Sequence, residues 1–437
     1  MSLIKKIQNK DANVGVIGLG YVGLPLSMEF VRAGFNVTGI DIDSTKITSL
    51  KNNHNYIQDV NDQELSEAIK SGKLNATSDF SVLNKLDTVS ICVPTPLNKQ
   101  KDPDISYINN VIEKLKDFIH QDMLIILEST TYPGTTRELI LPELESSGLK
   151  IGTDFFLCFS PERIDPGNKD FGTANTPKVI GGITKACSIQ GTALYETIVD
   201  KVVSVSSPES AEMVKLLENT FRAINIGLAN EMAIMCEKLG VNVWEVIEAA
   251  ATKPFGFMKF LPGPGLGGHC IPIDPHYLSW KLKALDYDAR FIQLAGEINT
   301  SMPNHVINLI IKGLNRKQKS IKGSKILVVG VSYKKNVNDV RESPALDVMK
   351  LLNNNGAFTC YYDPLVPSIQ INDENIDGLE NITSDFLLDI DAVIIITDHD
   401  CINFDLIAEH SDLIIDTRNI IKTKSEDIIK LGVGISI

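Results

Sequence analysis

The chain has 437 residues, of which 43% are hydrophobic and 22% are charged, and this composition excludes a wholly disordered or fibrous protein. Its 42 Lys and Arg against 55 Asp and Glu give a formal net charge of −13, which argues against general nucleic-acid binding because that requires cations to neutralise phosphates. The N-terminus lacks the apolar core of a signal peptide, no apolar run approaches the roughly 20 residues of a membrane span, and the 7 cysteines form no Cys-x-x-Cys pair. We therefore expect a cytoplasmic protein without membrane insertion, disulfide framework or metal site.

The first part of the chain alternates apolar strands with amphipathic helices. A short strand is predicted at 13–17, it ends at Gly18, and a helical pattern follows at 24–33. Further strands are predicted at 37–40, 88–93, 124–127 and 155–159. This alternation is typical of a parallel α/β domain, and we predict that it occupies residues 1–206.

A long helix is predicted in the middle of the chain. Residues 211–239 contain no proline and repeat apolar residues at intervals of three and four. This pattern indicates a helix of roughly 29 residues with a length of more than about 40 Å. We predict a helical central domain at 207–315. The apolar stripe of the long helix favours packing against the core or a second subunit, so a homodimer or higher homo-oligomer is expected.

The last part of the chain repeats the first pattern. Residues 325–330 again form an apolar strand that ends in glycine, and they are followed by a helix at 345–353 and strands at 392–397 and 413–416. We predict a domain at 316–437. The expected fold class is therefore α/β, with two Rossmann-like doubly wound domains joined by a long central helix and a helical middle region.

A glycine triplet, Gly18-Leu19-Gly20-Tyr21-Val22-Gly23, lies between the first strand and the first helix, which is the context of a dinucleotide-binding fingerprint. Asp41 follows at the end of the second strand, where a carboxylate accepts from ribose hydroxyls and repels a 2′-phosphate, so NAD is favoured over NADP. The segment after Gly330 lacks the triplet. That suggests another ligand there, one whose phosphates contact Lys334, although an exposed lysine pair is an alternative interpretation.

A glycine- and proline-rich loop precedes Cys270. Residues 262–268 contain four glycines and two prolines, so they form neither a helix nor a regular strand, and the backbone can approach a ligand closely. Cys270 has His269 beside it and Asp274 four residues on. From the spacing alone, a nucleophilic thiol and an inert apolar thiol both remain open.

Together these motifs resemble the UDP-glucose / UDP-N-acetylhexosamine 6-dehydrogenase family from about Asn13 to Asn419. The supporting stretches are 18–23, 93–96, 128–130, 160–163, 214–219, the loop around Cys270, 333–334 and 339–344. The resemblance implies a two-step oxidation of a sugar C6 alcohol to a carboxylate with two NAD⁺, and hence a role in polysaccharide biosynthesis. It also implies that a cysteine holds the intermediates as thiohemiacetal and thioester, and that the active site lies between domains.

The resemblance also implies the site residues. The catalytic set is Cys270 as nucleophile, Lys215 and Asn219 as the pair that stabilises negative charge on oxygen, Asp274 and Thr130 assisting the thiol and orienting water, and Glu162 placing substrate and water. The NAD contacts are Gly18, Gly20, Tyr21, Val22, Gly23, Asp41, Lys46, Pro94, Thr95, Thr130 and Arg341. The substrate contacts are Glu162, Arg163, Lys215, Asn219, Phe257, Gly267, Lys334 and Arg418.

The identity of the sugar is indicated by two segments. Residues 161–168 and the spelling Gly267-Gly268-His269-Cys270 resemble the N-acetylhexosamine branch, in which Arg163 would donate to the acetamido carbonyl or a ring hydroxyl. Residues 165–168 and 175–178 favour UDP-N-acetylglucosamine, whereas Lys259 and Leu261 depart from the pattern of relatives in the loop expected to line the sugar. UDP-N-acetylmannosamine, UDP-glucose, a non-catalytic NAD-binding regulatory protein and a two-electron hydroxyacid dehydrogenase remain as alternatives.

Overall fold

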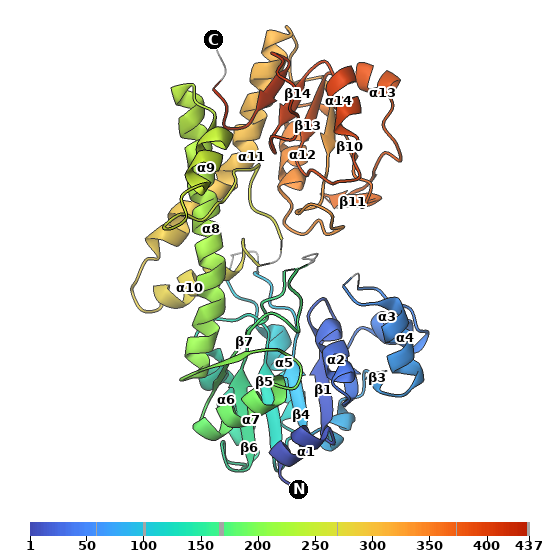
Figure 1. The fold of residues 1–437 in the computed structure, drawn as a ribbon, viewed down its shortest axis with the longest axis vertical. Helices are drawn as coiled ribbons and strands as arrows, with labels where there is room; N and C mark the ends of the chain where they lie inside the picture. Colours follow the sequence, from blue (N-terminus) through green and yellow to red (C-terminus); the bar gives the residue numbers. More distant parts are fainter. Residues whose placement is uncertain (58, 99–101, 166–169, 269, 373, 435–437) are drawn as a thin grey trace. The chain divides into compact units, whose positions relative to one another are not determined.

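The computed structural model describes residues 1–57, 59–98, 102–165, 170–268, 270–372 and 374–434. In this part of the chain the residues form two compact units, one from Met1–Glu218 and His276–Tyr287, the other from Asn219–Pro275 and Asp288–Ile437. Each unit contains one mainly parallel, Rossmann-like sheet with helices around it, so the predicted α/β fold class is confirmed (Figure 1). The domain boundaries predicted after residues 206 and 315 stay predictions.

Within the described residues, the first unit contains an eight-stranded sheet of order β3-β2-β1-β4-β5-β6-β7-β8. The strands are β1 (Asn13–Ile17), β2 (Asn36–Ile40), β3 (Leu74–Thr77), β4 (Thr88–Ile91), β5 (Met123–Leu127), β6 (Phe155–Phe159), β7 (Lys178–Gly182) and β8 (Val202–Val205). Only the β6–β7 pair among them is antiparallel. The direction of the strand order reverses between β1 and β4, which is where doubly wound sheets bind ligands, at the carboxyl ends of the strands.

Helices cover both faces of the first sheet (Figure 1). They are α1 (Leu3–Asn9), α2 (Gly23–Arg32), α3 (Ser44–Lys51), α4 (Asp62–Lys70), α5 (Ser106–Leu115), α6 (Leu141–Glu145), α7 (Lys185–Tyr195), the 3-10 helix Phe80–Lys85 and the π-helical segment Thr135–Ile140. Strand β5 is buried on both faces: Leu124 and Ile126 belong to one apolar cluster, and Met123 and Ile125 belong to another. This burial explains why β5 is an uninterrupted apolar run.

The long central helix is α8 (Pro208–Leu239), and it contributes residues to both units. It begins at Pro208, because proline is compatible with the first turn of a helix, where its missing N–H costs nothing. The other helices of this region are α9 (Val243–Ala251), α10 (Asp274–Lys283) and α11 (Arg290–Arg316).

The second unit contains a five-stranded parallel sheet, counted over the residues that are described, with the order β10-β9-β13-β14-β15. Its strands are β9 (Lys325–Val329), β10 (Phe358–Tyr362), β13 (Ala392–Ile395), β14 (Ile414–Asp416) and β15 (Ile428–Lys430), and β11 (Ser368–Ile371) and β12 (Glu374–Asp377) form a separate antiparallel pair. The helices are α12 (Pro344–Asn354), α13 (Ser384–Leu388) and α14 (Phe404–His410). Here the strand order reverses between β9 and β13, so a ligand is again expected at their carboxyl ends.

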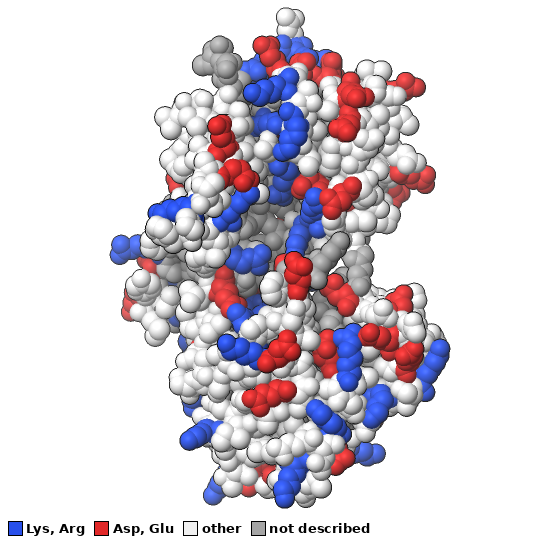
Figure 2. Space-filling view, viewed as in Figure 1, with Lys and Arg blue, Asp and Glu red and all other residues white. Residues whose placement is uncertain are grey.

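Two surface properties bear on partners. No helix among the described residues is long and apolar enough to cross a membrane. On the face of the first unit seen in Figure 2, acidic and basic side chains are interspersed. That face therefore presents no continuous basic surface of the kind that a nucleic-acid backbone requires.

Candidate active site

The three glycines of the loop after β1 differ in whether a side chain could be accommodated at their positions. Gly18 has φ +93°, and a Cβ there would lie 2.6 Å from the carbonyl oxygen of Cys92. A Cβ on Gly23 would lie 1.8 Å from the carbonyl oxygen of Gly18. A Cβ on Gly20 would meet nothing within 4 Å. The first and third glycines are thus required by the turn itself, whereas the second leaves open space beside the N-terminus of α2, where a pyrophosphate can approach.

The carboxylate of Asp41, at the end of β2, is fixed against this loop. Its Oδ2 accepts from the backbone N–H of Leu19 at 2.8 Å and pairs with Nζ of Lys46 at 3.0 Å, and its Oδ1 accepts from the N–H of Asp43 at 2.9 Å. Lys46, predicted as an NAD contact, is thus an ion-pair partner of Asp41. The open space over Gly20 and a positioned carboxylate fit the pyrophosphate and a ribose of NAD.

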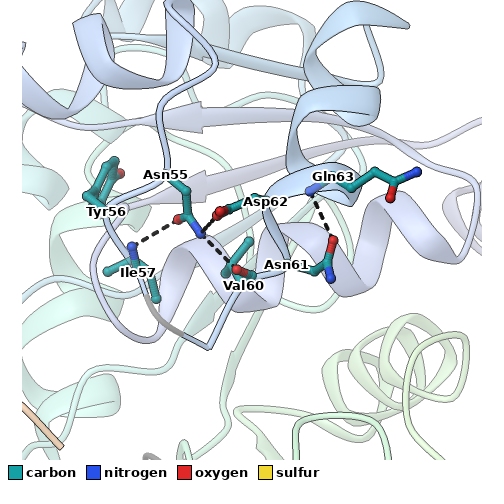
Figure 3. A pocket seen from close by; sticks show the side chains of 7 residues that line it. All are labelled: Asn55, Tyr56, Ile57, Val60, Asn61, Asp62 and Gln63. Carbon is teal, nitrogen blue, oxygen red and sulfur yellow. Dashed lines mark hydrogen bonds between the residues drawn. The ribbon is translucent and has the colours of Figure 1, made fainter.

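A surface pocket of about 720 Å³ adjoins the glycine loop, and Figure 3 shows the residues that line it, which are Asn55, Tyr56, Ile57, Val60, Asn61, Asp62 and Gln63. The side chain of Asn55 accepts from the N–H of Ile57 at 2.9 Å and donates to the carbonyl oxygen of Val60 at 2.8 Å. Tyr56 donates its hydroxyl to the carbonyl oxygen of Leu19 at 2.8 Å. Burial, with nearby Asp41, raises the pKa of Tyr56, so the phenol stays a donor that supports the glycine loop.

Two alanine substitutions in the glycine loop are expected to have separable effects. Gly23→Ala should lower the melting temperature and abolish NAD binding, because backbone cannot cheaply relieve a 1.8 Å contact. Gly20→Ala is the matched variant: it should keep the wild-type melting temperature and weaken NAD binding by about tenfold or more, since the added methyl occupies the open space. Thermal melts and calorimetric titration with NAD measure both quantities. Wild-type NAD affinity in Gly20→Ala would show that the cofactor does not use this loop.

The segments after β4 and β5 hold three further predicted cofactor residues. Pro94 is exposed and Thr95 is partly exposed after β4, and Thr130 is partly exposed after β5. The hydroxyl of Tyr277 donates to the carbonyl oxygen of Thr95 at 2.7 Å, and Ser129 Oγ donates to the carbonyl oxygen of Val93 at 2.8 Å. These contacts hold the two segments at the carboxyl edge of the first sheet, as the prediction of NAD contacts requires.

Glu162 and Lys215 meet in the first unit. Nζ of Lys215, on α8, donates to the backbone carbonyl oxygen of Glu162 at 2.6 Å, and Lys215 is only 9% exposed. Burial alone would raise the pKa of the Glu162 carboxyl, but the Lys178 ammonium and the N–H of Arg163 hold that pKa below its usual value. Glu162 is therefore an ionised, fixed carboxylate rather than a proton donor at neutral pH.

Arg163 is held by residues that the sequence did not single out as its partners. Its Nη2 lies 2.7 Å from Oε1 of Glu218, and its Nη1 donates to the carbonyl oxygen of Pro177 at 2.7 Å. Glu218 lies on α8 between Lys215 and Asn219. Its place in the family-like stretch 214–219 is the feature of the sequence that could have pointed to it. Residues 166–168 of the sugar-branch segment lie outside the described residues.

In the second unit, the glycine-rich loop packs against two segments that follow strands of the last Rossmann-like sheet, one after β9 and one after β14. A Cβ on Gly263 would lie 2.7 Å from Nη1 of Arg418, and one on Gly267 would lie 2.7 Å from Cβ of Tyr333. The N–H of Gly268 donates to the carbonyl oxygen of Arg341 at 3.0 Å. Glycine is needed at 267, where a Cβ would also lie 3.0 Å from the carbonyl oxygen of Glu342. The packing brings the loop next to the predicted residues Arg341 and Arg418.

Cys270 lies at the entrance to α10. It is partly exposed and in no disulfide, and its carbonyl oxygen accepts from the N–H of Asp274 at 2.8 Å. Asp274 is 2% exposed, and its Oδ2 accepts from Nδ2 of Asn219 at 2.5 Å. Three of the predicted catalytic residues thus lie together in the second unit. His269 is outside the described residues.

The loop after β9 in the last sheet has the same backbone geometry as the glycine loop after β1, but the acid that follows the neighbouring strand makes different contacts. Gly330 has φ +77°, and a Cβ there would lie 2.2 Å from the carbonyl oxygen of Thr397, as Gly18 approaches Cys92 in the first unit. Asp363 follows β10 as Asp41 follows β2, but its Oδ2 accepts from the N–H of Val331 at 2.7 Å and contacts Nε2 of buried His399 at 3.1 Å. This carboxylate, which the sequence analysis missed, is engaged internally and holds the loop after β9.

The loop after β9 and the turn after β14 place two predicted substrate residues at one edge of this sheet. Lys334 is partly exposed on the former. Arg418, on the latter, donates from Nε to the carbonyl oxygen of Ile396 at 2.6 Å. Phe257, the remaining predicted contact, is 44% exposed in the segment before the glycine-rich loop. No cluster of three or more His, Cys, Asp or Glu in the described residues is arranged to hold a metal ion.

Comparison with known proteins identifies the family. Models of the UDP-glucose/GDP-mannose dehydrogenase family match residues 12–199 (NAD binding domain), 209–301 (central domain) and 327–423 (UDP binding domain). The NAD binding domain confirms the predicted cofactor.

Curated relatives and solved structures agree with this assignment. The UDP-N-acetyl-D-mannosamine dehydrogenase of Pyrococcus horikoshii is 35% identical over 427 residues, covering 96% of this chain and 99% of its own. The UDP-N-acetyl-D-glucosamine 6-dehydrogenase of Pseudomonas aeruginosa is 35% identical over 359 residues, covering 82% and 84%. A solved structure of UDP-D-ManNAc dehydrogenase from Pyrococcus horikoshii matches with TM-score 0.88 and 34% identity, covering 97% and 100%. Because the three family models together span most of the chain, the protein belongs to the UDP-glucose/GDP-mannose dehydrogenase family and is an NAD-dependent nucleotide-sugar dehydrogenase.

Proposed function

We propose that the enzyme oxidises the C6 hydroxymethyl group of UDP-N-acetyl-D-glucosamine to a carboxylate by way of a covalent adduct on Cys270. The observation that carries this proposal is the arrangement in the second unit, where the carbonyl oxygen of Cys270 accepts from the N–H of Asp274, the first residue of α10, and the buried carboxylate of Asp274 accepts from Asn219. A hydroxyacid dehydrogenase that removes two electrons has no use for such a thiol. A UDP-N-acetylhexosamine is further supported by the two relatives, which are named for the manno and gluco epimers.

The thiol answers a chemical problem of the reaction. Removal of the first hydride converts the alcohol to an aldehyde, which would escape or hydrate if it were free. Bound NAD⁺ supplies the hydride acceptor at each of the two oxidations. Cys270 Sγ adds to the C6 aldehyde to give a thiohemiacetal, its oxidation gives a thioester, and water releases the carboxylate. The balance is one alcohol, two NAD⁺ and one water giving one carboxylate, two NADH and three protons.

Other residues stabilise charge and position water. We propose that the Lys215 ammonium and the Asn219 amide, one turn apart on α8, stabilise negative charge on the sugar O6 in each addition and oxidation. Asp274 would assist the thiol and, with Thr130, orient the hydrolytic water. Glu162, whose carboxylate is held ionised, would place the substrate and that water.

Arg163 is the proposed determinant of the N-acetyl group. Its guanidinium is oriented by Glu218 and by the carbonyl oxygen of Pro177, which fixes the plane from which it can donate. We propose that this plane meets the acetamido carbonyl of the hexosamine. The gluco epimer is preferred on the sequence of residues 165–168 and 175–178, and the manno epimer is the second candidate because a relative over nearly the whole chain bears that name.

The proposal predicts a stoichiometry of two NADH per sugar. Purified enzyme with limiting UDP-N-acetyl-D-glucosamine and excess NAD⁺ should reach an absorbance endpoint at 340 nm that corresponds to two NADH. UDP-N-acetyl-D-mannosamine and UDP-glucose, assayed in parallel, should give lower kcat/KM. One NADH per sugar would contradict the covalent route, and a higher kcat/KM with either of the other sugars would reassign the substrate.

We also propose that the enzyme is a homodimer or a higher homo-oligomer. Large apolar side chains of α8 face solvent in the single chain: Leu217 is 62% exposed, Leu228 is 54% exposed and Leu239 is 75% exposed. Apolar side chains repeated along one helix are typical of a surface covered by another subunit. A second copy of the chain is the simplest cover for this helix.

A further inference from the structure

A buried ion cluster lies in the first unit, at the carboxyl edge of β5 and β6. Lys178 begins β7, and its Nζ contacts Oε2 of Glu128 at 2.6 Å and Oε2 of Glu162 at 3.0 Å. The side chains of Lys178, Glu128 and Glu162 are 4%, 0% and 12% exposed. Tyr195 donates its hydroxyl to the other oxygen of Glu128. One ammonium thus bridges two carboxylates that water barely reaches.

Both carboxylate oxygens of Glu162 accept hydrogen bonds, one from Lys178 and the other from the backbone. Lys178 holds one carboxylate oxygen, while the other, Oε1, accepts from the N–H of Arg163 at 2.7 Å and from that of Ile164 at 2.9 Å. The backbone carbonyl oxygen of the same Glu162 accepts from Nζ of Lys215 at 2.6 Å. A continuous chain of contacts therefore runs from Lys178 through Glu162 to Lys215.

A buried ion cluster of this kind contributes little net stability to a fold. Removing charges from water costs more than their pairing usually returns, and apolar replacements of such clusters are often neutral or stabilising. Burial would lower the pKa of Lys178, but the two carboxylates raise it above its usual value. Burial raises the pKa of Glu128, and Lys178 offsets part of that shift. Burial would also raise the pKa of Glu162, but Lys178 and the N–H of Arg163 lower it.

We propose that Lys178 is a positioning residue: it fixes Glu162 so that the carbonyl oxygen of Glu162 holds the Lys215 ammonium where the reaction needs it. This inference rests on the proposed function in one respect, the role of Lys215 at the sugar. The positioning itself is a property of the free enzyme and can be measured without turnover.

Several titratable groups face this cluster and belong in the interpretation of any pH profile. They are Glu128 after β5, Cys92 after β4, Tyr195 on α7, Arg163 after β6, and Lys215 and Glu218 on α8. Replacement of Lys178 by an uncharged residue leaves Glu162 buried without its ammonium, so the pKa of Glu162 should rise. Activity should then fall as the pH decreases through that raised value.

The first test measures the Lys215 amine directly. Lys178→Met, Lys178→Arg and wild-type enzyme are labelled briefly with acetic anhydride, and acetylation is read peptide by peptide by mass spectrometry. Lys215 should react at least about fivefold faster in Lys178→Met, because its hydrogen bond to Glu162 is loosened, and near the wild-type rate in Lys178→Arg. Exposed Lys185, on α7 of the same unit, should react equally in all three proteins. Unchanged Lys215 labelling in Lys178→Met would overturn the proposal.

The second test uses kinetics with whichever nucleotide sugar the wild type oxidises. Lys178→Met should lower kcat by about 10- to 100-fold at pH 7 with little change in KM for NAD⁺, and the acid limb of its pH profile should lie at least about one pH unit higher. Lys185→Met is the matched control and should match the wild type. In a Lys215→Met background, the fold loss in kcat caused by Lys178→Met should be clearly smaller than in the wild-type background, and the remaining loss reports the placement of substrate and water by Glu162. Fully multiplicative losses would reject the route through Lys215.

Glu162→Gln keeps the experiment decisive if Lys178→Met does not fold. That variant removes the charge at the other end of the contact, retains the side-chain volume, and should reproduce both the faster labelling of Lys215 and the lowered kcat. A folded Glu162→Gln with wild-type labelling would contradict the proposal. Absence of turnover by wild-type enzyme with every UDP-hexosamine would count against the proposed function alone, because the labelling result stands without a substrate.

Discussion

Cys270→Ser is expected to abolish formation of the uronate while the enzyme still binds NAD. A serine hydroxyl in place of the thiol is a far weaker nucleophile toward the C6 aldehyde at neutral pH, so the thiohemiacetal that the second oxidation requires does not accumulate. Loss of a covalent nucleophile commonly costs factors of roughly 10³ to 10⁶ in kcat, and we expect at least about 10³ here. NADH formation at 340 nm under excess sugar and NAD⁺ measures this loss.

Cys401→Ser is the matched control for that experiment. Cys401 is an exposed free cysteine in the same unit, so it undergoes the same chemical change without any predicted role. It should retain wild-type kcat, and calorimetric titration with NAD should give the same affinity in both variants. Turnover of Cys270→Ser at the wild-type rate with two NADH per sugar would remove the covalent intermediate from the mechanism.

The parts of the fold that the sequence predicted are those in which one physical signal dominates. Strands β1 and β5 are covered on both faces, so they are continuous apolar runs that no surface helix would show. Strand β7 was missed because Lys178 begins it and Gly181 and Gly182 end it, and this composition argues against a buried strand. Its burial becomes intelligible only when the carboxylates that neutralise Lys178 are known.

The candidate site shows the same division between local and long-range information. The glycine loop after β1 and the loop before Cys270 were identified because backbone geometry demands glycine at particular positions in them. The contact of Asn219 with Asp274 joins residues far apart in the chain, and only the resemblance to a family suggested that they act together. Asp363 carried no signal at all, because a single acid after a strand is common.

Lys215→Met is expected to lower kcat by about 10²- to 10³-fold, the usual effect of deleting one donor to an oxyanion. Lys215 is buried with its ammonium directed at the carbonyl oxygen of Glu162, and methionine keeps most of the apolar stem while removing the charge. Since the ammonium is proposed to stabilise charge that develops during reaction, kcat and kcat/KM should fall together. Initial rates over a range of sugar concentrations separate the two parameters.

Lys238→Met, an exposed substitution on the same helix, controls for the loss of a positive charge from α8 and should leave both parameters unchanged. NAD affinity should be the same in Lys215→Met and wild type, because Lys215 is not among the residues predicted to bind the cofactor. A Lys215→Met enzyme within about threefold of the wild-type kcat would mean that O6 is stabilised by the amide of Asn219 without help from an ammonium. In that case the contact of Lys215 with Glu162 would serve only to join α8 to the segment after β6. The contacts from Lys178 through Glu162 to Lys215 would then have a structural role and no role in positioning a catalytic group.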